Sequence, residues 1–241
     1  MKVKRIAVGV LATALCLGPA GPALAAPLSM AKLAPQVTGT RLQSALLPAS
    51  AFGDGFTVAD RFDTGNALLP PVALFSPSDS TCSLFQPYTL VVGFGNTAGA
   101  TEGVTNSHPA IGDYPNVVLA AEQGVLQFQT IKAAATFFSQ AFSLYKQCSA
   151  FTESVGSDSV QLELTTQSLS STTIDTNEAF QLIQYVDVAS RPAVSFYQST
   201  AVVLSGTNVY AIDNLDGTND PIAAWLLGNL IHRVQALYKH H

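Results

Sequence analysis

The sequence has few of the residues that most often carry out chemistry. Four histidines occur, and two of them, His240 and His241, are the last residues of the chain. There is no Gly-x-Ser-x-Gly motif, which would mark a nucleophile elbow, and no Cys-x-x-Cys pair, which would mark a redox centre. The segment Gly93-Phe94-Gly95 lacks the third glycine of a dinucleotide-binding loop. The sequence therefore carries no signature of a serine hydrolase, a thiol oxidoreductase or a nucleotide-binding enzyme.

Positive charge is also scarce. The chain has eleven basic and sixteen acidic residues, and three of the basic ones, Lys2, Lys4 and Arg5, lie at the N-terminus. Without residues 1–25, eight basic residues face sixteen acidic ones, a net charge of −8. This balance argues against nucleic acid and against anionic lipid as electrostatic partners. After the N-terminal segment, no apolar run approaches the roughly 20 residues that cross a bilayer, so we expect no transmembrane segment in the mature chain.

The first 25 residues have the features of a secretory signal peptide. A basic start precedes an uncharged, mostly apolar run over residues 6–17, and glycines and prolines follow it. Ala23-Leu24-Ala25 then provides the small-x-small pattern that signal peptidase requires. We predict cleavage before Ala26 and a secreted or periplasmic location, in or near the cell envelope.

The cysteines allow two predictions. Cys16 lies in the apolar run, where a lipoprotein carries its lipid, but Leu15 stands where lipidation normally needs a small residue. We therefore favour a cleaved signal over a lipid anchor at Cys16. Cys82 and Cys148 remain in the mature chain, in an oxidising compartment. We predict a structural Cys82–Cys148 disulfide, which contributes about 4 kcal/mol in the chain-entropy model.

Residues 26–40 are rich in Ala, Pro, Ser and Thr and are predicted to form a linker, with one domain over residues 41–241. A short helix is expected around Leu42–Leu47, and residues 53–81 are loop-rich. Alternating apolar residues predict strands. A turn is predicted at Gly124, and Leu126 and Phe128 form one face of the strand that continues after it. The predicted strands cover residues 88–94, 116–121, 160–164, 180–188, 193–198, 201–204 and 208–212.

Two longer segments have helical periodicity. Apolar residues from Ile131 to Tyr145 recur every three or four positions, after a possible N-cap at Thr130. A second helix is predicted from an Asp220 cap to about Tyr238, with Trp225 on its apolar face. The predicted architecture is α+β: a twisted, mainly antiparallel sheet with two long helices packed on one face.

Three parts of the sequence are candidates for a catalytic or metal site. His108 lies in the polar stretch Asn106-Ser107-His108-Pro109, interpreted as a loop without a nucleophile nearby, and His232 lies on the predicted last helix, where we expect a surface residue. Residues 213–220, predicted to form a polar loop, are rich in oxygen ligands, but the EF-hand register places Ile212 and Ala223 at the ligand positions that open and close the site. We therefore predict no catalytic residue, no metal site and no cofactor; the ligand-binding residues stay unidentified.

Several short motifs occur in a recognisable order: Leu46-Leu47-Pro48, Cys82, the strand through Leu126 and Phe128, Ala133-Ala134-Ala135, Phe137-Phe138, Tyr145-Lys146-Gln147-Cys148, and Asn208-Val209 before the last helix. In this order they resemble the PknH-like extracellular sensor domain family. Its members lie outside the membrane, on actinobacterial receptor Ser/Thr kinases and on free-standing exported proteins. Relatives usually have Trp where Tyr145 stands, and many have a second disulfide in the C-terminal half, where this chain has no cysteine.

The resemblance implies a binding or sensing module with a cleft between sheet and helices, and not an enzyme. We expect an exported, sensor-like domain that binds a small molecule or a cell-envelope component. Two alternatives remain at this point. One is an interaction or structural role with another envelope protein. The other is an envelope hydrolase, which would require convergent carboxylates or a site centred on His108 inside a cleft.

Overall fold

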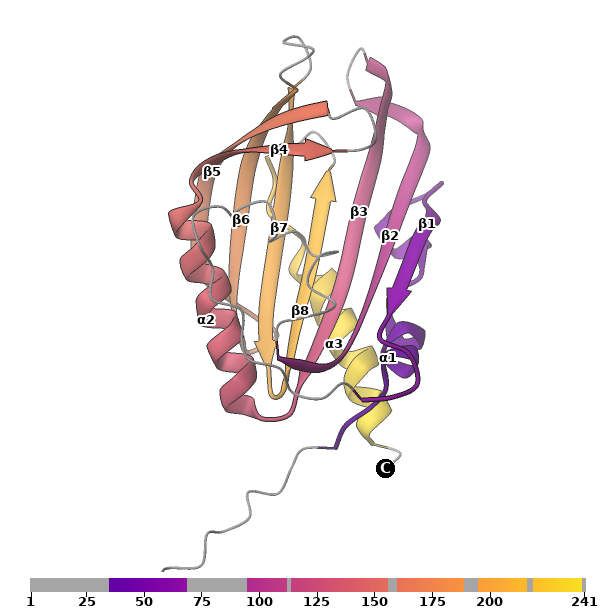
Figure 1. The fold of residues 1–241 in the computed structure, drawn as a ribbon. Coiled ribbons are helices and arrows are strands. Elements are labelled where there is room, and N and C mark those ends of the chain that lie inside the picture. Colours follow the sequence, from indigo (N-terminus) through magenta and orange to yellow (C-terminus); the bar gives the residue numbers. More distant parts are fainter. Residues whose placement is uncertain are drawn as a thin grey trace, which may run out of the picture. The chain divides into compact units, whose positions relative to one another are not determined.

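An antiparallel sheet of eight strands organises the domain in the computed structural model (Figure 1). The structure describes residues 35–68, 95–111, 114–155, 160–188, 195–215 and 219–239. All of its elements belong to the unit Leu33–His241. The strands are β1 (Thr57–Asp63), β2 (Asn96–Ile111), β3 (Tyr114–Phe128), β4 (Ala150–Val155), β5 (Val160–Ile174), β6 (Asn177–Val188), β7 (Ser195–Ser205) and β8 (Asn208–Leu215). The helices are α1 (Gly39–Ala45), the 3-10 helix η1 (Ala49–Phe52), α2 (Ile131–Gln147) and α3 (Ala224–Tyr238).

The sheet is built from two meanders that meet in its middle. Its strand order is β1-β2-β3-β8-β7-β6-β5-β4. Helix α2 carries the chain from β3 to the far edge, and the strands from β4 onward return until β8 pairs with β3. This closure places Glu122 of β3 directly opposite Asp213 of β8. Two residues 91 positions apart in the sequence thereby become neighbours at the centre of the sheet.

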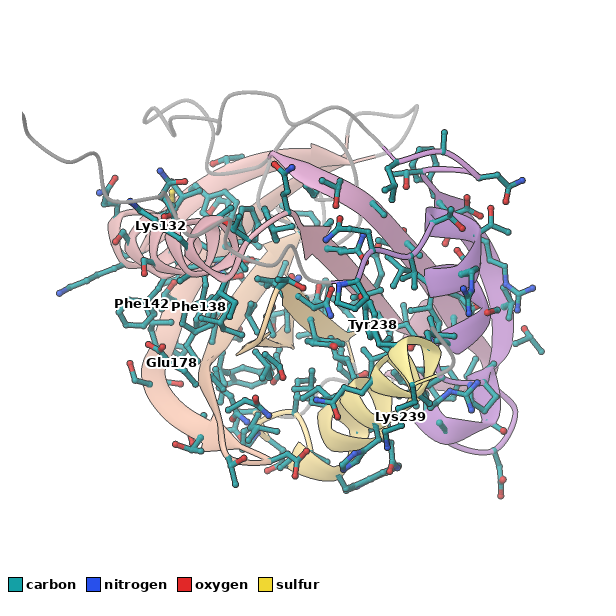
Figure 2. All side chains as sticks on the ribbon, turned by 90° about the horizontal axis from the view of Figure 1, so that it is seen from below. Lys132, Phe138, Phe142, Glu178, Tyr238 and Lys239 are labelled. Atoms are coloured by element: carbon teal, nitrogen blue, oxygen red, sulfur yellow. The ribbon has the colours of Figure 1, made fainter. Side chains whose placement is uncertain are left out.

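The two long helices cover opposite faces of the sheet (Figures 1 and 2). In β7, Val202 belongs to the apolar cluster under α2, whereas Ala201 and Val203 belong to the cluster under α1 and α3. The α+β class and the antiparallel sheet are confirmed, but the structure differs from the expectation that both helices lie on one face. The physical reason is visible in β7, whose uninterrupted apolar run is typical of a strand that is buried on both sides.

Helix α2 begins and ends where its local sequence indicates. The Thr130 hydroxyl accepts a hydrogen bond from the Ala133 N–H at 3.1 Å, and the Cys148 N–H donates to the Leu144 carbonyl at 2.7 Å. The aromatic stripe of the helix packs around Phe180 of β6, with ring centroids 5.2 Å from Phe138 and 5.8 Å from Tyr145. The prediction of a core-facing helix capped by Thr130 is confirmed.

Strand β2 and the middle of β3 differ from the prediction. Gly124 does not form a turn, because it lies inside β3 between Thr101 of β2 and Ala211 of β8. The stretch Asn106-Ser107-His108-Pro109 belongs to β2 and not to a loop. Residues 96–111 are mostly small and polar, so they show no apolar alternation, and their strand conformation comes from pairing with β1 and β3. The predicted strands over 193–198 and 201–204 are one strand, β7.

The start of α3 also differs. It begins at Ala224, without a side-chain cap, and not at Asp220. The preceding segment is held by the sheet instead, because the Ser199 hydroxyl donates to the Asp220 carbonyl and Gln181 donates to the Ile222 carbonyl. These tertiary bonds replace the capping that the sequence favours. Trp225, predicted to lie on the apolar face, is 58% exposed.

The exposure of Trp225 gives a first prediction. Trp225→Ala should change the free energy of unfolding by no more than about 0.5 kcal/mol, as for other surface substitutions. Ile231 lies on the same helix and is fully buried. Removing one methyl group in Ile231→Val should cost about 1 kcal/mol. Urea unfolding of both variants decides the matter, and a larger loss for Trp225→Ala would mean that the indole is part of the core.

Two glutamines of β3 hold the N-terminal arm, defined as residues 35–47, at both ends of α1. Gln127 exchanges two hydrogen bonds with the backbone of Val37, at 2.8 and 3.0 Å. Gln123 does the same with the backbone of Leu47, at 2.8 and 2.7 Å. Residues 35–40, the last of the predicted linker 26–40, therefore pack as part of the domain.

Several predictions fall outside the described residues. They concern the signal peptide with Cys16, the strand over 88–94, and Cys82 with its disulfide. Cys148 itself is buried at the C-terminal end of α2. Within the part of the chain that the structure describes, no helix has the length and the apolar character needed to cross a membrane.

Candidate functional site

A cavity of about 460 Å³ lies over β1, β2 and β3 and reaches to β7 and β8. Side chains alternate between the two faces of a strand, so Glu122 points to the same face as Leu126 and Phe128, and Asp213 to the same face as Ala211. Since Leu126, Phe128 and Ala211 pack under α2, these carboxyl groups lie on the α2 side of the sheet. We call it the Glu122–Asp213 pocket. Its polar lining comes from Asp60, Glu122, Gln198 and Asp213, and its apolar lining includes Val104, Leu162, Phe196 and Leu215.

The carboxyl groups lie in one row across the sheet. Asp60 of β1 pairs with Gly103 of β2, Gly103 with Glu122 of β3, and Glu122 with Asp213 of β8. The Gly103 N–H donates to Asp60 Oδ1 at 2.9 Å, and the same oxygen leaves no room for a β-carbon at Gly103. A glycine at this position lets the Asp60 carboxylate approach the strand and take its place in the row.

Asp213 is fixed by its neighbours on β7. Its Oδ2 accepts from Gln198 Nε2 at 2.5 Å, and its Oδ1 accepts from the Thr200 hydroxyl at 2.9 Å. Both oxygens act as acceptors, an arrangement that suits an ionised carboxylate. Gln198, Thr200 and Asp213 are all buried, so the orientation of this carboxylate is set by the sheet.

Glu122 has the opposite character. Burial in the pocket, followed by the nearby charges of Asp213 and Asp60, raises the pKa of Glu122 to about 9. At neutral pH the Glu122 carboxyl therefore holds its proton. A protonated acid beside an oriented carboxylate, with apolar walls around them, can bind a polar head group while the walls hold an apolar body.

Sequence reasoning missed Glu122 and Asp60 and placed Asp213 in a loop. Asp213 is in fact part of β8, and residues 216–218 of the predicted loop lie outside the described ranges. A signal for Glu122 was present, because it stands four and six residues before Leu126 and Phe128 in the same strand. A strand continued through Gly124 would have placed a carboxyl group on the core face.

The histidines do not join this pocket in the region that the structure describes. His108 lies in β2, but its side chain is outside the described residues. His232 is exposed on α3, with Nε2 3.3 Å from Asp175 Oδ2 in the turn between β5 and β6. Among the described side chains, no group of three or more His, Cys, Asp or Glu is placed to hold a metal ion.

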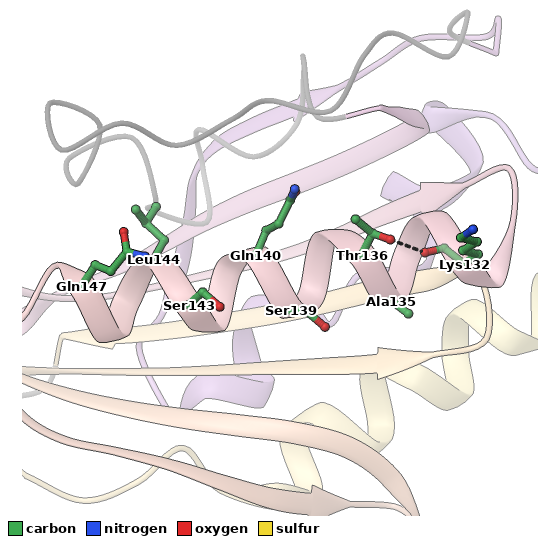
Figure 3. Close-up of a pocket in the computed structure, with 8 residues that line it drawn as sticks. All are labelled: Lys132, Ala135, Thr136, Ser139, Gln140, Ser143, Leu144 and Gln147. Atoms are coloured by element: carbon green, nitrogen blue, oxygen red, sulfur yellow. Dashed lines mark hydrogen bonds between the residues drawn. The ribbon is translucent and has the colours of Figure 1, made fainter. Parts of the chain in front are cut away.

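A second hollow follows the outer side of α2 (Figure 3). Its volume is about 450 Å³, and every described residue that lines it belongs to that one helix. Its lining includes the short polar side chains of Ser139 and Ser143, and Thr136 donates its hydroxyl to the Lys132 carbonyl of its own helix at 2.9 Å. Since no groups converge from different elements, we place the candidate site in the Glu122–Asp213 pocket instead.

Comparison with known proteins gives one informative result. No family model matches the chain, and no curated protein matches its sequence. Among solved structures, the chain is similar to the crystal structure of the extracellular domain of PknH from Mycobacterium tuberculosis. The TM-score is 0.54 at 15% sequence identity, and the match covers 84% of this chain and 98% of that chain. The chain therefore has a fold similar to that of the PknH extracellular domain.

Proposed function

We propose that the mature protein is an exported, non-enzymatic, sensor-like domain that binds a small amphiphilic molecule in the Glu122–Asp213 pocket. The pocket itself is the observation that carries the proposal. Its 460 Å³ lies within the range of about 300–1,000 Å³ typical of ligand sites. The fold shared with the PknH extracellular domain supports a sensor-like role of the PknH-like kind.

The lining of the pocket defines the chemistry of this ligand. Phe196, Leu162 and Leu215 offer an apolar surface, and burial of each ligand methylene there would contribute about 0.8 kcal/mol. Glu122, Asp213 and Gln198 are neighbours on β3, β8 and β7, so they would fix one end of the ligand. We infer a molecule with one polar head and an apolar body, small enough to fit between the strands.

The cell envelope is the proposed source of the ligand. The signal peptide predicted over residues 1–25 would deliver the domain there, and the predicted Cys82–Cys148 disulfide suits that compartment. The net charge of −8 expected after cleavage again disfavours nucleic acid. An envelope component or a small molecule from outside the cell would then reach the pocket directly.

Native mass spectrometry tests the proposal. Mature wild-type protein isolated from its own host should carry a discrete extra mass that denaturation removes. Ala120 lines the pocket, and Ala120→Phe would fill it. We expect the fraction of ligand-bound protein to fall about tenfold or more in that variant. Ala236→Phe, an exposed position on α3, is the matched control and should keep the ligand. Equal occupancy in Ala120→Phe and wild type would place the ligand elsewhere.

A hydrolase of envelope glycans is the second candidate. Convergent carboxyl groups in a cleft are what such an enzyme requires, and the Glu122–Asp213 pair supplies one protonated and one acceptor carboxyl. We rank it second because both Asp213 oxygens already accept hydrogen bonds from Gln198 and Thr200. Release of reducing ends from host envelope glycans by wild type, and its loss in Glu122→Gln, would reverse this ranking.

A further inference from the structure

We propose that the head group of the ligand is an organic cation, an amine or alkylammonium group, which binds against Glu122 and displaces its proton. This inference rests on the proposed function, because it specifies the ligand of the same pocket. It follows from three features of the pocket: the sign of its charges, the bonding of Glu122, and the apolar walls.

All titratable groups that line the described part of the pocket are acidic. Asp60, Glu122 and Asp213 come from three different strands, and the lining includes no Lys, Arg or His. The β7 groups beside Asp213, namely Gln198 and Thr200, are uncharged. A carboxylate or phosphate head would be repelled by the buried Asp213 and, from the exposed side of the pocket, by Asp60, whereas a cation would be attracted.

Glu122 is the carboxyl group that can bind such a cationic head group. Asp213 already bonds Gln198 and Thr200, and Asp60 bonds the Gly103 N–H. No described residue forms a hydrogen bond with the Glu122 carboxyl, although this side chain faces the pocket and is partly buried. A carboxyl that faces the pocket without a hydrogen bond from the described protein residues can take a ligand group as its bonding partner.

The protonation balance follows from the charge of the ligand. At neutral pH, Glu122 is protonated because burial raises its pKa to about 9. An ammonium group within about 4–6 Å favours the ionised form and lowers that pKa. The ligand therefore arrives as R–NH3⁺, the Glu122 carboxyl becomes a carboxylate, and one proton passes to the solvent. An uncharged head would accept a hydrogen bond from Glu122 and release no proton.

A metal ion fits the described part of the pocket less well than an organic cation. Calcium takes about six to eight oxygen ligands, and the described residues contain no group of three acidic or histidine side chains close enough to hold a metal. The row of Asp60, Glu122 and Asp213 extends across four strands, from β1 to β8, and does not surround a point. The apolar wall around Phe196 and Leu162 would in addition contact the hydrocarbon part of an amine.

Isothermal titration calorimetry of the mature chain with three eight-carbon probes tests the inference. Octylamine, octan-1-ol and octanoate share one apolar body and differ in head charge. We expect octylamine to bind about tenfold or more tightly than octan-1-ol, and octanoate to bind most weakly. Titrations at pH 7 in two buffers of different ionisation enthalpy should report release of about one proton for octylamine and none for octan-1-ol.

Glu122→Gln separates this inference from a structural effect. The amide keeps the shape of the protonated acid but cannot ionise, so the preference for octylamine over octan-1-ol should fall about tenfold and the proton release should disappear. Glu178→Gln, at an exposed position near the start of β6, is the matched control and should change neither quantity. Binding of octan-1-ol as tight as that of octylamine, or binding of octylamine without proton release, would refute the cationic head and leave the proposed pocket intact. Failure of all three probes to bind would refute both.

Discussion

Gln127→Leu is expected to lower the free energy of unfolding by about 3 kcal/mol. The Gln127 side chain is fully buried and joins the sheet to two other elements. Its Oε1 accepts from the Val37 N–H at 2.8 Å and from the Tyr238 hydroxyl at 2.9 Å. Its Nε2 donates to the Val37 carbonyl at 3.0 Å and to Thr97 Oγ1 at 3.2 Å. Leucine would fill a similar volume but leave these groups without their partner.

The measurement is urea unfolding monitored by circular dichroism. Gln129→Leu, two residues further along and exposed, is the matched control and should shift the free energy of unfolding by less than about 0.5 kcal/mol. We also expect Gln127→Leu to expose the N-terminal arm to proteolysis before the sheet unfolds, because Val37 loses both backbone bonds. Equal stability of the two variants would mean that the arm is not anchored by this amide.

Glu122→Gln is expected to stabilise the protein at pH 8 by on the order of 2 kcal/mol and to have little effect near pH 4.5. The pKa of Glu122 is about 9 in the folded state, against an ordinary value of 4.5. Folding therefore favours the protonated form. The favourable contribution of that group is fully present below pH 4.5 and is lost as the pH rises toward 9. We expect less than the full shift would provide, because the side chain is only partly buried.

Chemical unfolding at pH 4.5, 6, 7 and 8 checks this prediction. The difference in free energy of unfolding between Glu122→Gln and wild type should grow steadily with pH, since glutamine cannot ionise. Glu178→Gln removes a carboxylate from an exposed position and serves as the control, with a difference that stays nearly constant (Figure 2). A pH-independent difference for Glu122→Gln would show that Glu122 titrates as an ordinary surface carboxylate.

Local sequence patterns predicted those helices and strands that are determined by residues close together in the sequence. The four-and-three spacing from Ile131 to Tyr145, together with the Thr130 hydroxyl, defined α2 at both ends. Alternation around Leu164 and over residues 180–188 identified β5 and β6, which are covered mainly on one side. In such segments the pattern of burial follows directly from the spacing of apolar residues.

Tertiary structure decided those features that depend on contacts between residues far apart in the sequence. Gly124 continues a strand because β2 and β8 pair on either side of it. Trp225 is exposed because the hydrogen bonds to the carbonyls of Asp220 and Ile222 set where α3 begins. Similarly, the helices cover both faces because β7 and β8 lie in the middle of the sheet, a strand order that is set by pairing between distant segments.

By itself, the sequence determined the α+β class and the acidic balance of the chain, and it predicted an export signal, which stays a prediction. Only the tertiary structure made a candidate site, because the pairing of β3 with β8 brings Glu122 beside Asp213 and Asp60 approaches through Gly103. Each carboxyl alone is an ordinary acidic residue. Burial of Glu122 among apolar walls from strands far apart in the chain, together with the nearby charges of Asp213 and Asp60, raises the pKa of Glu122 and makes its carboxyl a group that can bind a ligand.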